Sequence, residues 1–266
     1  MDDLLWNLAQ PLLPPAPSHE RGGRTRIDDK TILRAIFYIL RTGIQWRALP
    51  FGFGVAASTV HARFQEWRAA GFFERLHAAA LQAYDEAGGI QWEWLSVDGA
   101  MTKAPLGQEA TGRNPTDRGK SGTKRSVVTD GRGQVLGIAV VGANRNDHLL
   151  LGRTLDAIVV PRPEPSPDHP QNVCLDKGYD YAAARDALAE RDYTAHIRSR
   201  GEEQRSIRDL PGYRARRWVV ERTHSWMNRY RRILVRWEKK VDNYLAMLQL
   251  ACANRTIHAA AALAAP

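Results

Sequence analysis

Hydrophobic positions recur at helical spacing in the first third of the chain. Apolar residues of the stretch KTILRAIFYILRT lie three or four positions apart, which is the period of an amphipathic helix. Asp28 or Asp29 can cap the beginning of this helix, and Gly43 can end it. A second helix is expected to begin at Ser58, and the stretch FFERLHAAALQAYDEAG predicts a third. We therefore expect residues 1–88 to form a small all-helical domain.

Three short helices in this order are typical of a helix-turn-helix module, which places one helix in the major groove of DNA. The helix from Ser58 would then present Thr59, His61 and Arg63 to the DNA. A small helical bundle that only packs or dimerises fits the same pattern. Residues 1–88 alone do not separate the two interpretations.

From Gln91 onward the hydrophobic period changes. The stretches IQWEWLSVDGA, KRSVVTD and GQVLGIAVVGA predict three strands, and the DGRG between the last two is a hairpin-type turn. HLLLGRTLDAIVV predicts a helix that Asp147 can cap. The chain then continues with the short strand NVCLD, the helix YAAARDALAERD, the strand YTAHIRSR and an arginine-rich helix.

This order of elements has a known counterpart. Three strands, a helix, a strand, a helix, a strand and a helix form a ribonuclease H-like α/β domain, with a mixed five-stranded sheet and helices on its faces. We expect this domain to span residues 89–258 and to be followed by an Ala-rich tail, residues 259–266.

Composition narrows the class of protein. The 266 residues carry a net charge of +9, contain no run of about 18 apolar residues, and begin with an acidic stretch unlike a signal peptide. A cytoplasmic protein is expected, associated with the nucleoid when it is bound there. The two cysteines, Cys174 and Cys252, have neither metal-ligand spacing nor a disulfide framework, so we interpret both as small buried residues.

The positive charge is concentrated in one segment. Ten of the 38 Lys and Arg residues lie between Tyr213 and Lys240. On a helix, a mostly apolar seam would contain Val219, Thr223, Trp226, Tyr230, Ile233 and Trp237. The opposite side would carry Arg214, Arg217, Glu221, His224, Asn228, Arg231 and Arg232. One carboxylate thus stands on an otherwise cationic or neutral face.

Two interpretations of Glu221 follow. Arg217 and Glu221 can form an ordinary surface pair four residues apart, which contributes about 0.2–0.5 kcal/mol. Alternatively, the arginines contact nucleic-acid phosphates and Glu221 helps to hold a divalent metal ion. The second interpretation requires partner carboxylates elsewhere in the chain.

Two acids end predicted strands, and each is closely followed by a glycine. Asp98 lies in LSVDGA and Asp176 in VCLDKGYD, at the ends of strands that are neighbours in the expected sheet. The last helix can bring Glu221 over the same edge. Three carboxylates there would repel one another unless cations were present, and two Mg²⁺ ions about 3.5–4 Å apart, or Mn²⁺ in their place, suit such oxygen ligands. His148 and His224 are then expected to be phosphate or structural contacts.

A second basic segment lies between the first two strands. GRNPTDRGKSG lacks the spacing of a phosphate-binding loop. Its Lys120, together with Lys124 and Arg125, is expected to belong to a mobile loop that contacts DNA. A flexible, solvated loop is the alternative.

These motifs together carry a family resemblance. The segments VDG, DKGYD and RRWVVERTHSWMNRYRRILVRWEK resemble the surroundings of the DDE triad in bacterial insertion-sequence transposases, most closely the family named after insertion sequence five. PLLP, GIQWRALP and STVHARFQEW extend the resemblance to the N-terminal segment. The resemblance implies that Asp98, Asp176 and Glu221 are catalytic metal ligands of a transposase. Such an enzyme cleaves DNA at the terminal inverted repeats of its element and joins the 3′ ends to target DNA, and a homodimer is expected because two ends are held together.

Related transposases share a Tyr, Arg, Glu, Lys signature around the third acid. Arg217, four residues before Glu221, matches it and implies a phosphate contact. Arg214 stands at the Tyr position and Asn228 at the Lys position, although nearby residues can substitute. The resemblance and the charge pattern together place DNA contacts in this segment at Arg214, Arg217, Arg222, His224, Asn228, Arg229, Arg231 and Arg232.

Two other functions fit parts of the pattern. One is a non-catalytic helix-turn-helix DNA-binding regulator, whose C-terminal domain only dimerises. The other is a ribonuclease H-like nuclease that cuts DNA without joining it. Metal-independent binding to a palindromic site would identify the first, and cutting without strand transfer the second.

Overall fold

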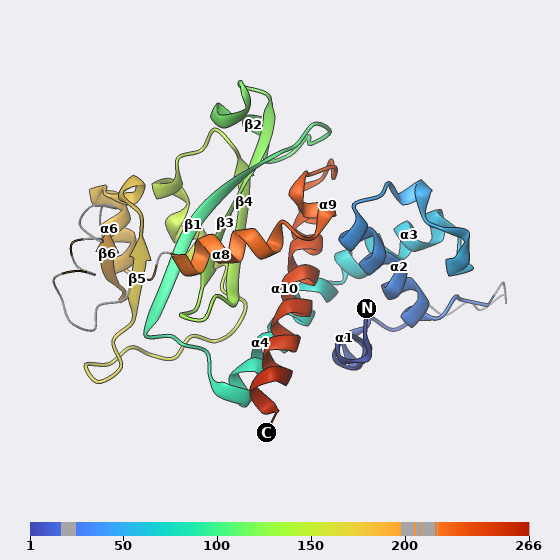
Figure 1. Ribbon diagram of the computed structural model, residues 1–266, viewed down its shortest axis with the longest axis horizontal. Helices are drawn as coiled ribbons and strands as arrows, with labels where there is room; N and C mark the ends of the chain where they lie inside the picture. The colour runs from blue at the N-terminus through green and yellow to red at the C-terminus, as the bar shows by residue number, and fades with distance from the viewer. Residues whose placement is uncertain (17–24, 198–204, 206–207, 209–215, 217, 266) are drawn as a thin grey trace.

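The computed structural model describes residues 1–16, 25–197, 205, 208, 216 and 218–265 (Figure 1). The helices are α1 (Asp3–Ala9), α2 (Asp29–Thr42), α3 (Ala57–Ala69), α4 (Phe72–Gly88), α5 (Leu151–Asp156), α6 (Ala182–Ala189), α8 (Trp218–Met227), α9 (Arg231–Leu234) and α10 (Val241–Ala264). The strands are β1 (Trp94–Lys103), β2 (Gly112–Arg113), β3 (Ser121–Thr129), β4 (Val135–Gly142), β5 (Asn172–Leu175) and β6 (Thr194–Ile197).

The strands form one mixed sheet in the order expected from the sequence. β1 pairs antiparallel with β3, and β3 pairs antiparallel with β4 on its other side. β5 pairs parallel with both β1 and β6. This ribonuclease H-like topology confirms the predicted fold class, and the short β2, which pairs with the beginning of β3, is an additional strand.

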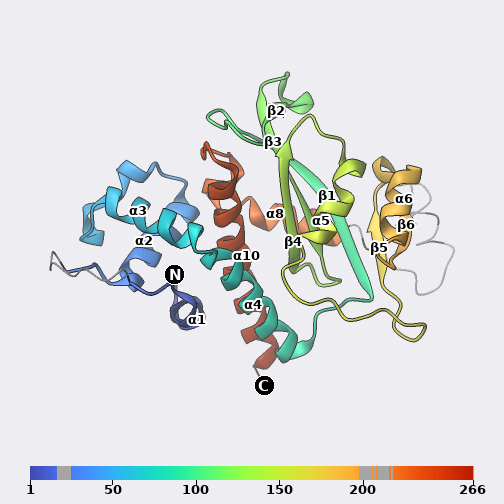
Figure 2. The same ribbon diagram turned by 180° about the vertical axis from the view of Figure 1, so that it is seen from behind.

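Helices cover both faces of this sheet. α8 packs against β1 and β3 on one face, and α5 packs against β3 and β4 on the other. Opposite views of the molecule show α8 in front of the sheet in one and α5 in front in the other (Figures 1 and 2). The sheet edge that carries the predicted acids therefore lies under α8.

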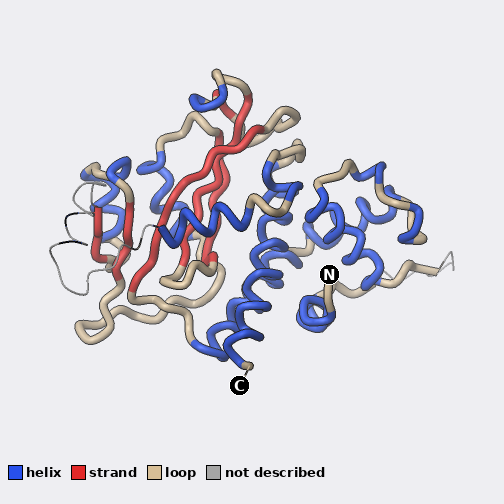
Figure 3. Tube along the Cα trace, viewed as in Figure 1, coloured by secondary structure: helices blue, strands red, loops and turns tan. Residues whose placement is uncertain are grey.

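The N-terminal region is all-helical, as predicted, and Figure 3 shows it as helices and loops. The cap at Asp28 is confirmed, since its Oδ1 accepts a hydrogen bond from the Thr31 N–H at 3.0 Å. Gly43 ends α2 in the left-handed conformation, with φ of 73°. The cap at Ser58 is wrong, because α3 already begins at Ala57. Residues 43–56 connect α2 to α3, which is much longer than the three or four residues of a helix-turn-helix turn.

The helical region shares its core with the rest of the chain. α10 lies along α4, between the sheet and α1–α3 (Figures 1 and 2). One hydrophobic cluster joins side chains of α2, α3 and α4 to those of α8, α10, β3 and β4. The division at residue 88 stays a prediction. The boundary of the Ala-rich tail also stays a prediction, and the structure adds that α10 continues through Ala264 and buries Ala260.

The arginine-rich segment is not one continuous helix. α8 ends at Met227, the Tyr230 N–H donates to the Met227 carbonyl at 3.0 Å, and α9 begins at Arg231. This turn changes the angular phase, so the seam predicted for a single helix fails at its far end, where Trp237 is 41% exposed. Trp226 is only half-buried. The apolar face instead includes Val220 and Met227, beside the predicted and confirmed Val219, Thr223, Tyr230 and Ile233.

Both cysteines are buried and reduced, as expected. Of the helices in the described residues, none is both long enough and apolar enough to cross a membrane.

Candidate active site

The first two acids lie on neighbouring parallel strands. Asp98 stands within β1, opposite Val127 of β3, and its Oδ1 accepts a hydrogen bond from the Gly99 N–H at 2.8 Å. Asp176 directly follows β5, and its Oδ1 accepts from the Gly178 N–H at 2.8 Å. Because β1 and β5 pair in parallel, both carboxylates belong to the same region of the sheet.

The third acid reaches this region from a helix. Glu221 lies in the first turn of α8, on its exposed side, and α8 packs across β1. Burial raises the pKa of Asp98 to about 6, and the negative charges of Asp176, Asp147 and Glu221 add to the rise, which the Gly99 N–H partly opposes. The structure thus places Asp176 and Glu221 near enough for their charges to act on Asp98.

Asp147 is a fourth acid of this region, and sequence reasoning missed it. The sequence suggested a helix cap, but the cap position is Asn146, and Asp147 is the first residue of the short helical turn Asp147–Leu150. Its Oδ2 instead accepts from Lys124 Nζ at 2.9 Å, and its Oδ1 is buried against Gly99 without a hydrogen-bond partner in the described residues. Any side chain at Gly99 would collide with this carboxylate, so the glycine is what admits Asp147 beside Asp98.

His224 and Tyr179 form the apolar side of the site. His224 Nε2 lies 3.9 Å from Asp98 Oδ2, and burial lowers the pKa of the imidazole to about 3 with help from the Arg125 charge. The ring is therefore neutral at physiological pH. Burial and the charges of Asp147, Asp98 and Asp176 raise the pKa of Tyr179 above its ordinary value. His224 is buried rather than exposed on the polar face, which corrects its expected position.

The described residues hold no group of three or more His, Cys, Asp or Glu side chains arranged to bind a metal ion. The chemistry of the region still suits a hard cation, since oxygen donors dominate it and the charge on Asp98 is opposed by its carboxylate neighbours. The acids interact, but they do not form a closed set of ligands.

Several predicted DNA contacts are in fact structural. The prediction of a mobile loop for Lys124 and Arg125 is wrong, because both lie in β3 and are buried. Lys124 Nζ donates to Asp147 and to the Arg145 carbonyl, and an Arg125 Nη donates to Asn228 Oδ1 at 2.6 Å.

Two further arginines are held inside the protein. Arg232 is buried and pairs with Glu238 at 2.9 Å, so it does not face DNA as predicted. Arg63 is also buried, paired with Asp29 and Glu66, so it cannot reach into a groove from α3. Burial of such ion pairs ties elements together rather than exposing charge.

The remaining predicted contacts are more accessible. The exposed ones are Lys120, Arg222, Asn228, Arg229 and Arg231. Thr59 and His61 are half-buried, and the His61 ring packs edge-on against Trp46 at 4.9 Å. Arg214 and Arg217 lie outside the described residues. The roles of these residues as DNA contacts stay predictions.

Comparison with known families covers nearly the whole chain. Residues 93–254 match the family model described as "Transposase DDE domain". Residues 1–77 match the model described as "Putative transposase of IS4/5 family".

Two curated proteins of Burkholderia cepacia are similar in sequence. The one named "Putative transposase for insertion sequence element IS402" is 40% identical over 149 residues, which cover 55% of this chain and 68% of that protein. The one named "Insertion element IS402 uncharacterized 16.2 kDa protein" is 35% identical over 118 residues, which cover 43% of this chain and 80% of that protein.

Solved structures resemble the chain only distantly. A piggyBac transposase synaptic complex with hairpin DNA has a TM-score of 0.48 at 10% identity, covering 98% of this chain and 73% of that one. The catalytic domain of the Mos1 mariner transposase has a TM-score of 0.31 at 13% identity, covering 73% of this chain and 94% of that one. The assignment rests on the family models and the sequence relatives, and by these the chain belongs to the DDE-type transposases of insertion sequences.

Proposed function

We propose that this protein cleaves DNA at the ends of its insertion sequence and joins the 3′ ends to target DNA, with Asp98, Asp176 and Glu221 as the catalytic carboxylates. The observation that carries the proposal is geometric: Asp98 of β1 and Asp176, directly after β5, stand at matching places of these parallel strands, and α8, which carries Glu221, packs against β1. Carboxylates from β1, β5 and α8 would thus be available to bind metal ions at one place, as phosphoryl transfer assisted by divalent metal ions requires.

The acids supply ligands of the kind that Mg²⁺ prefers, and Mn²⁺ can substitute. When bound, two such ions supply activation of the attacking oxygen and stabilisation of the leaving 3′-oxygen. Glu221, exposed on the first turn of α8, would complete the set of carboxylates that hold the ions.

The other residues of the region have supporting tasks in this proposal. Lys124 holds Asp147 through an ion pair of 2.9 Å and thereby fixes the charge next to Asp98. Neutral His224 covers Asp98 from α8 without competing for the ions as a cation would. The exposed Arg222 and Arg229 lie along the same helix and can contact phosphates. We propose a homodimer on DNA, since one protein copy has one such site and two ends must be joined.

The direct test is an assay on a DNA fragment that carries the element's own ends, with Mg²⁺ and a target plasmid. Wild-type protein should cut at the ends and produce joined products, whereas Asp98→Asn and Glu221→Gln should produce neither. Asp180→Asn is the matched control, because Asp180 follows the same strand as Asp176 but pairs with Arg185 at the surface. Full activity of Asp98→Asn or Glu221→Gln would refute the triad. Cutting without joined products would identify a nuclease, and metal-independent binding without any cutting would identify a regulator.

A further inference from the structure

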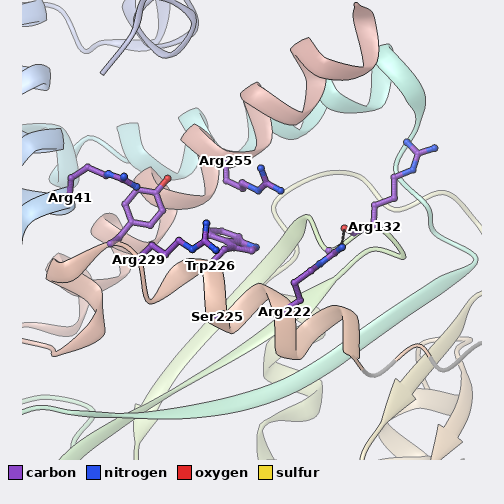
Figure 4. A pocket seen from close by; sticks show the side chains of 9 residues that line it. Arg41, Arg132, Arg222, Ser225, Trp226, Arg229 and Arg255 are labelled. Carbon is purple, nitrogen blue, oxygen red and sulfur yellow. Dashed lines mark hydrogen bonds between the residues drawn. The ribbon is translucent and has the colours of Figure 1, made fainter.

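A pocket of about 320 Å³ opens beside α8 and is lined by five arginines (Figure 4). The arginines are Arg41, Arg132, Arg222, Arg229 and Arg255. The rest of the lining is Gly133, Ser225, Trp226 and Tyr230, so no carboxylate lines the pocket within the described part of the chain. Its volume is at the small end of the range of about 300–1,000 Å³ that is usual for ligand pockets.

The pocket is assembled from four separate elements. Arg41 ends α2, Arg132 lies in the turn between β3 and β4, and Arg255 belongs to α10, while the other two arginines come from α8 and the turn after it. Arg222 Nη2 donates to the Arg132 carbonyl at 2.6 Å, which ties α8 to the hairpin turn. The Thr223 hydroxyl donates to the Gly133 carbonyl at 3.0 Å and fixes the same junction. Arg132 lines the pocket with its backbone, because its Nη1 donates to the Gly88 carbonyl at 3.2 Å and its side chain points away from the other arginines in Figure 4.

The charges in the pocket lack acidic partners. Arg41 stacks over the Tyr230 ring at 4.9 Å, and Arg222 stacks over the Trp218 ring at 4.5 Å. Among the described residues, none of the five arginines forms an ion pair with a carboxylate. Cations gathered in this way repel one another and favour a bound polyanion, to which guanidinium groups donate paired hydrogen bonds.

The position of the pocket indicates which polyanion. Glu221 and Ser225 are exposed and lie four residues apart on α8, and Ser225 lines the pocket. The pocket therefore begins about one turn of α8 beyond Glu221, on the flank that carries Arg222 and Trp226, and Arg229 lies in the turn that follows the helix. A DNA strand whose cleaved bond lies at the carboxylates would extend over the pocket. A small anion would not span the two places.

We propose that this pocket is a second DNA-backbone site, which binds phosphates beginning about one turn of α8 from Glu221. The half-buried Trp226 ring offers a flat surface to a neighbouring sugar or base. The proposal rests on the proposed function only in taking DNA as the ligand. A DNA strand bound in the pocket would also contact α2, α8 and α10 at the same time.

Site-directed crosslinking tests the location. Ser225→Cys places a thiol in the lining, and the two native cysteines are buried and should stay unreactive. The probe is a DNA duplex of the element's end that carries a thiol tether, as a mixed disulfide, on one backbone phosphate at a time. The introduced thiolate displaces the leaving thiol by exchange, so no oxidant is needed. Crosslinks should form at a few adjacent phosphates, and the exposed Ser166→Cys should form none of them.

A salt titration without metal tests the charge. Arg229→Ala combined with Arg255→Ala should weaken binding at least tenfold and make the dependence of affinity on salt shallower by about two, one for each lost phosphate contact. Arg34→Ala combined with Arg153→Ala removes two exposed arginines outside the pocket and should change neither value. Thermal melting would show that both double variants fold.

Three results would overturn the pocket proposal. These are equal crosslinking by Ser225→Cys and Ser166→Cys, unchanged salt dependence in the Arg229 and Arg255 double variant, and loss of the crosslink in millimolar pyrophosphate, which would indicate a small-anion site. None of these assays involves cutting. If the protein cuts the ends of the element but gives one of these three results, the proposed function stands and only the pocket proposal is lost. If it crosslinks as expected but never cuts, the pocket proposal stands and the proposed function is lost.

Discussion

The two flanks of α8 carry opposite charge, and the difference shows what each is suited to hold. On one flank, Glu221 joins Asp98, Asp147 and Asp176, whose charges repel one another. On the other, five arginines surround a pocket that no described carboxylate lines. Neither arrangement favours folding by itself. The buried face of α8 holds both in place through Val220 and Met227, which pack into the common core.

The flanks also differ in how far the protein compensates its own charge. On the acidic flank, Lys124 pairs with Asp147 at 2.9 Å. Within the described part of the chain, the contacts of the pocket arginines are with aromatic rings and backbone carbonyls and not with carboxylates. The acidic flank is thus partly neutralised and suited to a few small cations, whereas the arginine flank is suited to a long anion. This separation of charge can be broken at single positions.

The largest expected effect is the loss of DNA cutting on substitution of Glu221, compared with substitution of the adjacent Arg222 on the arginine flank. Glu221→Gln should lower the rate of end cutting by a factor on the order of a thousand or more, since a proposed metal ligand is lost. Its DNA affinity without metal should be unchanged or slightly higher, because a negative charge is removed. Arg222→Ala should instead weaken binding by roughly tenfold and lower the salt slope by about one. Comparable loss of binding in both variants would show that the flanks are not functionally distinct.

A glycine next to the arginine pocket gives the next largest effect. Gly43 has φ of 73°, and a Cβ there would lie 2.8 Å from Arg231 Cβ and 3.0 Å from its backbone carbon. Gly43→Ala should lower the free energy of unfolding by about 3 kcal/mol, from backbone strain together with overpacking. Gly54→Ala is the matched control, since Gly54 has φ of 65° but open space around it, and should cost about 1 kcal/mol. Urea denaturation would measure both free energies of unfolding. Equal losses would mean that the contact of α2 with α9 accommodates the added methyl group without strain.

The internal ion pair of the acidic flank gives a smaller effect. Lys124→Met should lower the free energy of unfolding by about 2 kcal/mol, because it leaves Asp147 near three other carboxylates, and Asp147→Asn should cost a similar amount by leaving the lysine unpaired. The double variant should lose at least 1 kcal/mol less than the sum of the two single losses. Strictly additive losses in urea denaturation would show that Lys124 does not compensate this flank.

Part of this arrangement could be predicted from the sequence. Strand periodicity and the order of elements led to the topology of the sheet, and the ends of apolar strands marked Asp98 and Asp176. Burial of charge was harder to predict. Every residue of β3 after Ser121 is buried, so Lys124 and Arg125 are enclosed despite a polar local sequence that suggests a loop.

The parts that sequence reasoning missed depend on contacts between distant segments. Nothing in the chain near Asp147 indicates that it packs against Gly99, and a helix cap is the ordinary role for an Asp at that place. The arginine pocket combines Arg41, Arg132 and Arg255 with α8, although these lie far apart in the sequence. The one sequence signal for the pocket was the excess of arginine in the segment around α8, and the turn after Met227 could not be inferred from it.

The smallest expected effect comes from adding a charge at Ser225. It should distinguish the flanks most clearly, because the same charge should change the stability of the fold and the affinity for DNA in opposite directions. Ser225 is exposed between Glu221 and Arg229, four residues from each, and lines the pocket. Ser225→Glu places a carboxylate among Arg222 and Arg229, so without DNA it should stabilise the fold by about 0.3 kcal/mol, after repulsion by Glu221 is included. The same change should weaken DNA binding several-fold at low salt, since it neutralises the pocket. Ser225→Lys should do the reverse in both measurements. If both substitutions shifted stability and binding in the same direction, size rather than charge would control this face, and the separation of charge across α8 would have no bearing on DNA.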